Sequence, residues 1–458
     1  MTISLSDKPD APKIIVVGAG LAGLTAAYRL QEKGYDVYVY EARQRPGGRV
    51  LTAQIGESLE ELGGKNFNDS HPPENSLKLI SDLGLDILQK EKPFSPIYAT
   101  GSSLESFLDI FKRFQETETL WVTLAKFAAS SQNLQQVIDS VFKDPDLHFI
   151  LSSTLKGYEG SAPLSLDPST IDTLYELFTR FLEIAQNLDE DPFPTFQWMT
   201  LKGGNAQLPL ALANRLINKV HYEEVLTAVQ RNPQNMTLIF NHHHEVEADI
   251  ILLAIPCSIL EVIDFRDEII PSEQLIRMKS LQYGTNGKIL VPSEFPLNKY
   301  NFVIQPDTVN WFNDEGQIIT FYYGGNAGIF DAKQAAFLLD RDLRNLKTVY
   351  PTLQISLDDI HSSQDRQLVS YDRSVFKSWA LDPYAKGSYS NRGVGTATWL
   401  SEMETLRGEK IRKAFRPVRD KLFFAGEHTT ILGTLGTLEG AIESGERMTR
   451  LIDKTISI

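Results

Sequence analysis

The chain has 458 residues, of which 42% are hydrophobic and 23% charged, the composition of a globular protein with two or three domains. Its formal net charge of −14 argues against nucleic acid and anionic membrane surfaces as partners. With one cysteine, Cys257, the chain forms no internal disulfide and no cysteine-rich metal site.

The N-terminal segment, MTISLSDKPDAPK, lacks a basic region followed by an apolar run, so we expect no secretory signal. The apolar segment 250–260 is too short to cross a membrane and is interrupted by Pro256. We therefore expect no membrane partner and a cytoplasmic location.

The first forty residues predict one βαβ unit. Residues 14–17 are four β-branched residues, which favours a buried parallel strand. A helical segment, 21–33, stops before Gly34, and a second strand covers 36–40. Between the first strand and the helix stand three glycines in the pattern G-x-G-x-x-G: Gly18, Gly20 and Gly23.

This unit predicts a dinucleotide site. Gly18 permits the tight turn, Gly20 lets a pyrophosphate approach the backbone, and Gly23 lets the helix pack on the strand. Ala22 belongs to the first helical turn, whose positive end points at the phosphates. Glu41, directly after the second strand, is placed to bind ribose hydroxyls, and its charge would repel the 2′-phosphate of NADP.

An arginine- and glycine-rich segment, ARQRPGGR, follows Glu41 and predicts a second anion cradle. Guanidinium groups offer forked, charged donors to phosphate, and glycines permit close backbone approach. A further glycine turn, EELGG, spans 60–64. A nicotinamide site does not need this additional loop.

The pattern E-A-R-x-R-x-G-G-R followed by E-L-G-G resembles the flavin-containing amine oxidases, which include monoamine, polyamine and L-amino-acid oxidases. The resemblance implies FAD, with Glu41 at the ribose and Arg43 and Arg49 beside the pyrophosphate and flavin. It adds further cofactor-binding residues: Ala42, Gly48, Gly63 and Gly64. Later segments extend the resemblance over the whole chain.

The segment from 72 to 198 is predicted to be mostly helical. Apolar residues at helical spacing indicate an amphipathic helix over 171–182, and 104–114 and 120–129 also have helical composition. In the family, such an insertion helps to form the substrate domain. We expect its many aromatic residues to lie in the core.

Strands are predicted at 220–229, 236–240 and 248–256. The run His242–His244 lies between two of them, and neighbouring strand side chains alternate faces, so we expect an exposed hairpin and no metal site. Val225 falls where the family contacts adenosine, and Cys257 is expected to be buried without a role.

Lys288 stands at the start of a predicted strand within 281–291. An ordinary strand lysine faces solvent. The resemblance implies that this lysine holds a water against flavin N5 and that its charge helps the reduced flavin react with oxygen.

The segment around Trp379 and Tyr389 resembles the family pattern W-x-x-x-x-Y-x-x-G-x-Y. Tyr389 falls on one wall of an aromatic cage that orients an amine before the flavin. Ser388 occupies the position of the cysteine that attaches flavin in monoamine oxidases. Serine forms no such thioether, so we expect non-covalent FAD.

The C-terminal segment predicts a buried strand, LFFAGE at 422–427, and a helix that begins at Leu438. The resemblance places Gly426, Glu427, Thr437 and Leu438 at the FAD, with the helix N-terminus facing the pyrimidine ring. Thr437 replaces the second cage tyrosine of monoamine oxidases, which leaves the cage half built.

One departure concerns the amino-acid oxidases. Several of them carry a carboxylate-binding arginine where this chain has Asn66. Lys65 is a possible substitute, with a solvent-facing lysine the alternative, and a basic residue of the middle segment is another source of a carboxylate ligand.

These observations predict an α/β protein with a Rossmann-like FAD-binding domain and a mixed α+β substrate domain. We assign 1–75, 203–285 and 395–458 to the first domain, and 76–202 and 286–394 to the second. Lys288, Trp379, Tyr389 and Thr437 are the predicted catalytic residues.

The predicted function is oxidative deamination of an amine, by hydride transfer to flavin N5 and reoxidation by O2 to peroxide. The expected partners are a small-molecule amine or amino-acid substrate and O2. The alternatives are an L-amino-acid oxidase, a flavin desaturase or dehydrogenase on a non-amine substrate, and an FAD-binding interaction protein without catalysis. A homodimer is compatible with the sequence.

Overall fold

The computed structural model describes residues 12–69, 72–93, 96–100, 103–106, 110–111, 119–186, 195–232, 235–294, 302–313, 317–353, 355 and 360–457. Residues 1–11, where we expect no secretory signal, lie outside these ranges. None of the helices within them has the length and apolar character needed to cross a membrane.

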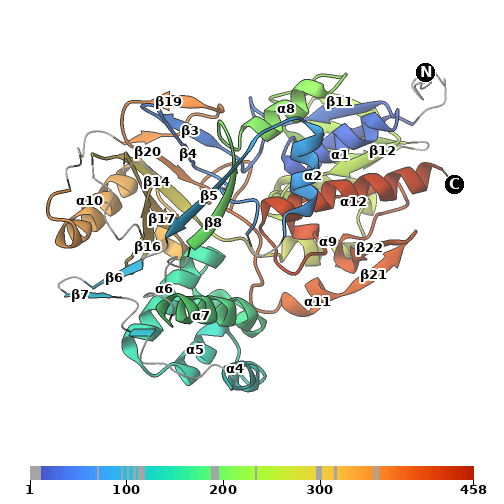
Figure 1. Cartoon of the computed structure of the whole chain (residues 1–458). Helices are drawn as coiled ribbons and strands as arrows, with labels where there is room; N and C mark the ends of the chain where they lie inside the picture. Colours follow the sequence, from blue (N-terminus) through green and yellow to red (C-terminus); the bar gives the residue numbers. More distant parts are fainter. Residues whose placement is uncertain are drawn as a thin grey trace.

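A four-stranded parallel sheet collects strands from both ends and the middle of the chain (Figure 1). Ile14 and Val16 belong to the hydrophobic cluster on one face of this sheet, and Ile15 and Val17 to the cluster on the other. Its strands, in spatial order, are β2 (Val37–Tyr40), β1 (Ile14–Val17), β12 (Ile250–Leu253) and β23 (Leu422–Phe424).

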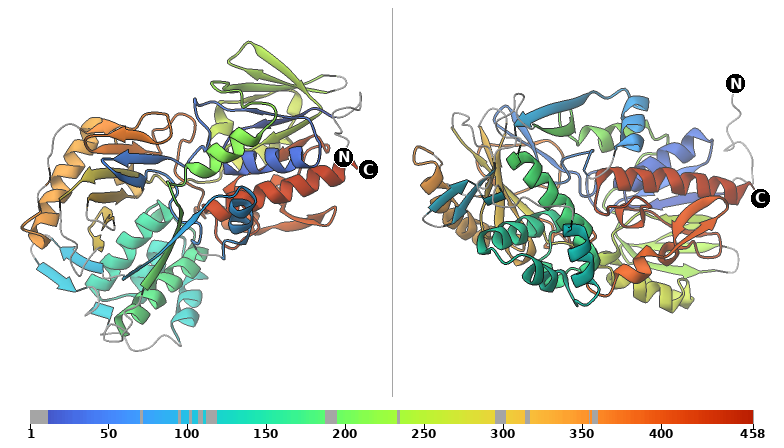
Figure 2. Two further views of the ribbon diagram at one scale, coloured as in Figure 1. Left: turned by 45° about the horizontal axis from the view of Figure 1, so that its top comes forward. Right: turned by 60° about the horizontal axis from the view of Figure 1, so that its bottom comes forward.

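Helices cover the first face of the parallel sheet. The long C-terminal helix lies beside the N-terminal one (Figures 1 and 2). Gly445 allows this approach, because a Cβ there would lie 2.5 Å from the carbonyl oxygen of Ala22. The helices are α1 (Leu21–Glu32), α2 (Glu74–Asp82), α8 (Gln207–Arg215) and α12 (Leu438–Ile456).

The second face of the parallel sheet packs against a small sheet with the order β11-β10-β9-β13. Cys257 is buried in this interface, as predicted, with 1% of its surface exposed. The elements are β9 (Leu226–Arg231), β10 (Met236–Phe240), β11 (His244–Ala248), β13 (Asp264–Phe265), the 3-10 helix η4 (Cys257–Val262) and α9 (Ser272–Lys279).

An eight-stranded sheet dominates the other part of the molecule (Figure 1). One face carries Ile289, Val291 and Phe321 and packs on the helix α10 (Ala332–Val349), which begins with a capping box from Asp331 and Gln334. The strands, in spatial order, are β18 (His361–Ser362), β20 (Val375–Ser378), β14 (Gly287–Pro292), β17 (Ile318–Tyr323), β16 (Thr308–Phe312), β15 (Phe302–Ile304), β6 (Pro96–Thr100) and β7 (Ser103–Ser106).

A helical bundle with its own core lies beside this sheet and reaches β15 through Ile304. Asp144 caps α6 by accepting hydrogen bonds from the backbone of Asp146 and Leu147, and Gly160 ends the helix in the left-handed conformation. The bundle contains α4 (Leu120–Ala128), α5 (Leu134–Val141), α6 (Pro145–Glu159) and α7 (Ile171–Gln186).

Smaller elements complete the fold. They are the sheet β19 (Val369–Tyr371), β3 (Thr52–Ile55), β4 (Ser58–Glu61); the ribbon β5 (Ile87–Pro93) with β8 (Thr195–Leu201); the hairpin β21 (Met403–Leu406) with β22 (Glu409–Arg412); and the short helix α11 (Ala397–Ser401). Single 3-10 turns occur at Pro163–Ser165, Pro168–Thr170, Arg266–Glu268, Gly325–Gly328, Lys413–Phe415 and Glu427–Thr429.

The structure confirms the predicted βαβ unit, the helices α4, α7 and α12, and the exposed hairpin turn at His242 and His243. Two predictions are wrong in part. The helix predicted over 104–114 begins as the strand β7, which pairs with β6; residues 110–111 are helical, and 107–109 and 112–114 lie outside the described residues. The strand predicted over 220–229 begins only at Leu226, because Glu223 adopts a positive φ of 62°.

Candidate functional site

The glycine loop between β1 and α1 forms an open cradle. Gly18 has a φ of +103°, and a Cβ there would lie 2.6 Å from the carbonyl oxygen of Ala254, at the end of β12. A Cβ on Gly20 would meet nothing within 4 Å, so this glycine borders open space. Helix α1 has no side-chain cap and no acidic residue in its first turn, which leaves its N-terminus suited to an anion.

Glu41 closes the cradle on the side of β2. Its carboxylate accepts hydrogen bonds from the backbone N–H of Ala19, at 2.7 Å, and of Arg43, at 2.9 Å. Burial raises the pKa of Glu41, and these two N–H groups oppose that effect by stabilising the ionised form. Glu41 also borders the cavity described below, and its binding to ribose hydroxyls stays a prediction.

The three arginines of the following loop have different surroundings. Arg43 makes a bidentate ion pair with the buried Asp382, at 2.5 and 3.0 Å, and borders the cavity described below. Arg45 does not border it and donates to the carbonyl oxygens of Pro46, Gly48 and Val50, which fixes the turn. Of the three arginines in the predicted anion cradle, Arg45 therefore supports the loop and does not face the cavity.

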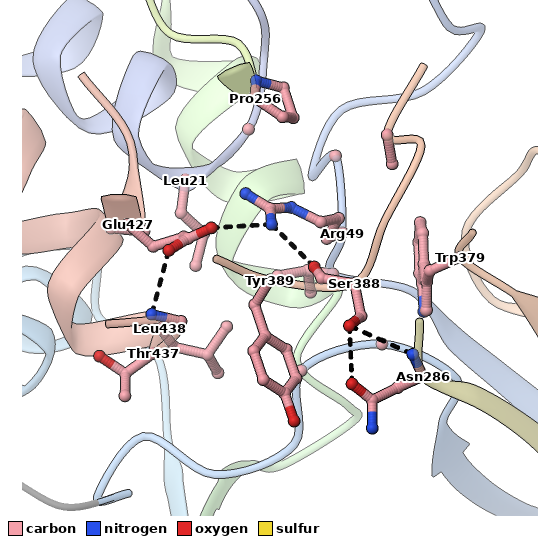
Figure 3. Close-up of a pocket in the computed structure, with 18 of the residues that line it drawn as sticks. Leu21, Arg49, Pro256, Asn286, Trp379, Ser388, Tyr389, Glu427, Thr437 and Leu438 are labelled. Atoms are coloured by element: carbon pink, nitrogen blue, oxygen red, sulfur yellow. Dashed lines mark hydrogen bonds and ion pairs between the residues drawn. The ribbon is translucent and has the colours of Figure 1, made fainter. Parts of the chain in front are cut away.

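Arg49 connects the N-terminal loop to the C-terminal segment (Figure 3). Its guanidinium donates to Glu427 Oε1 at 2.9 Å and to the carbonyl oxygen of Ser388 at 2.7 Å. Glu427 also accepts hydrogen bonds from Ser390 and from the backbone N–H of Gly436. One buried carboxylate therefore joins three segments that are distant in sequence.

The N-terminus of α12 lies next to this carboxylate (Figure 3). Thr437 caps the helix by accepting a hydrogen bond from the backbone N–H of Gly440 at 3.0 Å. Leu438 packs on Gly64, where a Cβ would lie 2.7 Å from the leucine side chain. The glycine of the E-L-G-G turn is therefore required by this close approach.

These segments surround a single cavity of about 440 Å³. Every predicted site residue borders it except Gly23, whose Cβ would lie 2.1 Å from the carbonyl oxygen of Gly18 and which thus serves helix packing. The open space at Gly20, the uncapped α1 and the polar carboxylate of Glu41 fit a dinucleotide. The predicted residues in the lining are Gly18, Gly20, Ala22, Glu41, Ala42, Arg43, Gly48, Arg49, Gly63, Gly64, Val225, Lys288, Trp379, Tyr389, Gly426, Glu427, Thr437 and Leu438.

Lys288 lies on β14 and points into the same cavity. It is buried, and its Nζ donates to the carbonyl oxygens of Glu61 and Gly63, both at 2.8 Å. The pKa of Lys288 is lowered to about 8, first by burial and then by the nearby charge of Lys65, against the effect of the surrounding carboxylates. Two of the three ammonium donors are engaged, which leaves one for a water or ligand.

Aromatic side chains line part of the cavity near Lys288. Trp379 donates from Nε1 to the carbonyl oxygen of Leu62 at 3.0 Å, which fixes its indole. The Tyr389 hydroxyl lies 3.2 Å from that of Tyr322 and donates to the carbonyl oxygen of Tyr158. Hydrogen bonds thus orient both predicted ring residues, Trp379 and Tyr389, in the lining of the cavity (Figure 3).

Comparison with known proteins assigns the chain to a protein family. A model of the flavin containing amine oxidoreductase family matches residues 21–452. The chain belongs to this family. Its Rossmann-like α/β fold and the flavin cofactor of the family agree with the cradle around Gly20 and Glu41.

The relatives of this flavin amine oxidoreductase have diverse names. The chain is 28% identical to a lysine-specific histone demethylase 1 homolog 2 of Oryza sativa subsp. japonica, over 96% of its own length and 58% of the relative's. It thus spans little more than half of that relative. It is 24% identical to the flavin-dependent L-tryptophan oxidase RebO of Lentzea aerocolonigenes, over 96% of this chain and 98% of that protein.

Among solved structures, cyclohexylamine oxidase from Brevibacterium oxydans IH-35A matches with a TM-score of 0.69 at 17% identity. The match covers 98% of this chain and 100% of that one, which shows a shared fold.

The amine oxidoreductase cavity contains residues that the sequence reasoning missed. Tyr322 and Trp311, on β17 and β16, stand in a T-shaped contact with ring centroids 5.7 Å apart. Tyr322 adjoins Tyr389, so an aromatic ring from β17 lies beside the predicted cage in which Thr437 provides none. Neither residue lies in a local motif; only the order of strands brings them to Lys288.

Three polar residues that follow the E-L-G-G turn also border the cavity. Asn66 is buried, and its amide donates to the Asp69 carboxylate at 3.2 Å. Burial raises the pKa of Asp69 to about 6, and this hydrogen bond and the charges of Arg180 and Lys288 oppose the shift. Lys65 lies over the rings of Trp198 and Trp311 and forms an ion pair with Glu60. Within the described residues, no group of three or more histidine, cysteine, aspartate or glutamate side chains has the arrangement of a metal site.

Proposed function

We propose that this protein is an FAD-dependent amine oxidase that deaminates a small amine and passes the electrons to O2, producing peroxide. One observation carries the proposal: a single cavity joins the dinucleotide cradle at Gly20 and Glu41 to an aromatic chamber at Lys288 and Tyr389. FAD, when bound, supplies the redox chemistry of C–N oxidation. The chain supplies binding, orientation and charge.

Each part of the cavity has a proposed task toward the cofactor. Glu41 binds the adenosine ribose, and the first turn of α1, including Ala22, faces the pyrophosphate. Val225 borders the adenosine, and Arg49 stands beside the flavin. The N-terminus of α12, at Thr437 and Leu438, favours negative charge on the pyrimidine ring.

The substrate chamber orients a neutral amine. Trp379 and Tyr389 present aromatic rings that exclude water and stack on the amine group. Lys288 borders the same cavity with one donor to spare and places a positive charge where oxygen is reduced. Trp379, Tyr389, Lys288 and Thr437 are therefore the residues to which we assign catalysis.

We also propose that FAD is bound without a covalent link. The Ser388 hydroxyl donates to the Asn286 side chain at 2.6 Å, and the only cysteine, Cys257, lies in the core behind the parallel sheet. We place the protein in the cytoplasm and keep the domain boundaries given above: 1–75, 203–285 and 395–458 for FAD, and 76–202 and 286–394 for substrate.

A second candidate substrate is an amino acid. Two basic side chains, Lys65 and Arg180, border the substrate end of the cavity, where a carboxylate would need a cation. Asn66, at the position of the family's arginine, instead bonds to Asp69. Amines carrying no carboxylate therefore remain the first candidate.

An anaerobic bleaching screen tests the proposal. FAD-loaded protein is mixed with monoamines, diamines and amino acids without oxygen, and the flavin absorbance is followed. Loss of absorbance with amines, and slower loss in Tyr389→Ala than in the exposed control Phe337→Ala, is the expected result. Bleaching by amino acids alone selects the second candidate, and no bleaching by any compound contradicts both.

A further inference from the structure

Two lysines share one aromatic ring in the substrate chamber. The Nζ of Lys65 lies 5.2 Å from the ring centroid of Trp311, and the Nζ of Lys288 lies 5.8 Å from the same centroid. The two nitrogens are therefore at most 11.0 Å apart, because 5.2 Å and 5.8 Å are measured to the same centroid. At such a separation in a buried site, where screening by salt is weak, one charge influences the ionisation of the other.

The two ammonium groups are fixed by consecutive residues of β4. Glu60 pairs with Lys65 through its carboxylate, whereas Glu61 accepts from Lys288 through its backbone carbonyl. Lys65 is held further by Trp198, whose ring centroid lies 5.1 Å from Nζ. Its side chain is only 17% exposed, so the charge is held near the chamber.

Other titratable groups lie around Lys288 on the elements that pack against it. From β4 the carboxylate of Glu61 is bound by Thr52 and the backbone of Asn205, and from the following loop Asp69 borders the cavity. From β20 the neighbour in register is Lys377, whose ammonium bonds to Asp382 at 2.5 Å. From β17 the neighbour is Tyr322, whose ring centroid lies 5.5 Å from the Lys288 Nζ.

Among these groups, the Lys65–Glu60 ion pair is the one that can change the ionisation of Lys288. Lys377 has its own buried carboxylate, and the Glu61 side chain is held by hydrogen bonds from Thr52 and from the backbone of Asn205. Burial, followed by Lys65, accounts for the lowered pKa of Lys288, and Glu60 is the first of the groups that oppose it. Lys65 and Glu60 thus act on Lys288 with opposite signs.

We propose that Lys65, held over Trp311 by Glu60, sets the proton occupancy of Lys288 and thereby the pH range in which bound FAD reacts with oxygen. Lys65 is a positioning residue that acts through Lys288 and need not touch the substrate. The proposal rests on the assigned role of Lys288, and its test separates the two.

Lysine-selective 13Cε labelling gives a direct measurement of Lys288 ionisation. The resonance absent in Lys288→Met identifies the residue in the FAD-bound protein. Lys65→Met is expected to raise the titration midpoint of this resonance by about one pH unit, because a like charge is removed. Glu60→Gln is expected to lower it by a similar amount, and Lys65→Arg and the exposed control Lys410→Met are expected to leave it unchanged.

The rate of reoxidation is a second measurement. Its pH midpoint, followed by stopped flow after anaerobic reduction, is expected to move in the same directions in Lys65→Met and Glu60→Gln. If Lys288→Met does not slow reoxidation, the role of Lys288 is wrong. If Lys288→Met slows it but neither Lys65→Met nor Glu60→Gln moves the Lys288 midpoint, only the present inference is overturned. Glu60→Gln alone decides the matter if Lys65→Met folds poorly.

Discussion

Arg49 and Glu427 form an ion pair of 2.9 Å although 378 residues separate them in the sequence. The pair links the loop after β2 to the end of β23, and both residues border the cavity. Burial by itself would raise the pKa of Glu427, but Arg49, His428 and the hydrogen bonds from Ser390 hold it below its usual value. The closure of the cavity at this point thus depends on one buried carboxylate staying ionised.

Arg49→Met is expected to lower the free energy of unfolding of the FAD-free protein by about 2–3 kcal/mol, because it leaves Glu427 buried without its cation. It is also expected to weaken FAD binding by about tenfold to a hundredfold, the effect of losing one charged hydrogen bond. Urea denaturation measures the first and flavin fluorescence titration the second.

The double variant Arg49→Met with Glu427→Gln is expected to be more stable than Arg49→Met, since the uncompensated charge is gone. Lys33→Met serves as the control, because its ion pair with Asp453 is exposed and is expected to be worth less than about 1 kcal/mol. An Arg49→Met protein as stable as this control would contradict the importance of the pair.

The flavin end of the site was predictable because its signals are local. The spacing of Gly18 and Gly20 sets a turn, and the strand before Glu41 fixes where its carboxylate emerges. The G-T-L-E-G-A segment likewise encodes its own helix start, with Thr437 as the cap. What the sequence did not reveal is that Arg45 supports the loop through carbonyl oxygens while Arg43 pairs with Asp382, since Asp382 lies 339 residues away.

Lys288→Met is expected to slow flavin reoxidation by about a hundredfold, the usual effect of removing one preorganised charge, while anaerobic reduction by substrate changes little. In the wild type the reoxidation rate is expected to fall as pH rises through about 8, where Lys288 loses its proton. Stopped-flow measurements from pH 6 to 10 check both. A flat profile in the wild type would contradict the role of the ammonium.

The same lysine predicts a pH dependence of stability. The pKa of Lys288 is about 8 in the folded protein, against 10.5 for an unperturbed lysine, so between these limits the unfolded chain binds more protons. The free energy of unfolding therefore gains a contribution that rises with pH across this window. Lys288→Met is expected to lack this contribution when the two proteins are compared by urea denaturation at pH 8 and pH 10.

Tyr389→Phe is expected to keep most of the kcat/KM, because it retains the ring and loses only the hydroxyl contacts to Tyr322, Tyr158 and Gly157, worth about 1 kcal/mol. Tyr389→Ala removes the ring and is expected to lower kcat/KM about tenfold or more. Steady-state kinetics with the amine found by the bleaching screen compares them. Equal losses in both variants would show that the hydroxyl, and not the ring, is required.

The substrate chamber was less predictable than the flavin cradle. Lys288 and Tyr322 are partners in register on β14 and β17, and Trp311 reaches them from β16. These contacts arise from antiparallel strand pairing over tens of residues, which no short motif specifies. The same limit explains why sequence reasoning did not place Asp69 in the chamber. It also explains why sequence reasoning left Lys65 open between a carboxylate ligand and a solvent-facing lysine.

Acid precipitation of the FAD-loaded protein is expected to release the flavin into a yellow supernatant. Ser388 has a hydroxyl where a thioether would require a thiol, and this hydroxyl is engaged with Asn286. Absorbance of the supernatant and the redissolved pellet gives the released fraction. Flavin retained in the pellet would refute non-covalent binding, and free FAD mixed with FAD-free protein provides the control.

Asp69→Asn is expected to raise the free energy of unfolding at pH 7.5 by about 1–2 kcal/mol, because burial raises the pKa of this carboxyl to about 6 and its ionised form opposes folding. The folded state binds the proton more tightly than the unfolded chain, so stability falls as pH rises from about 4 to about 6 and stays lower above it. The gain in Asp69→Asn is therefore expected to shrink when urea denaturation is repeated at pH 5.

The exposed Asp372→Asn serves as the control and is expected to change stability at neither pH. If Asp69→Asn is equally or less stable than the wild type at pH 7.5, the carboxylate is fully compensated by Asn66, Arg180 and Lys288. If it is more stable, Asp69 is a charge that the fold retains at a cost to stability, which is typical of groups that serve a ligand.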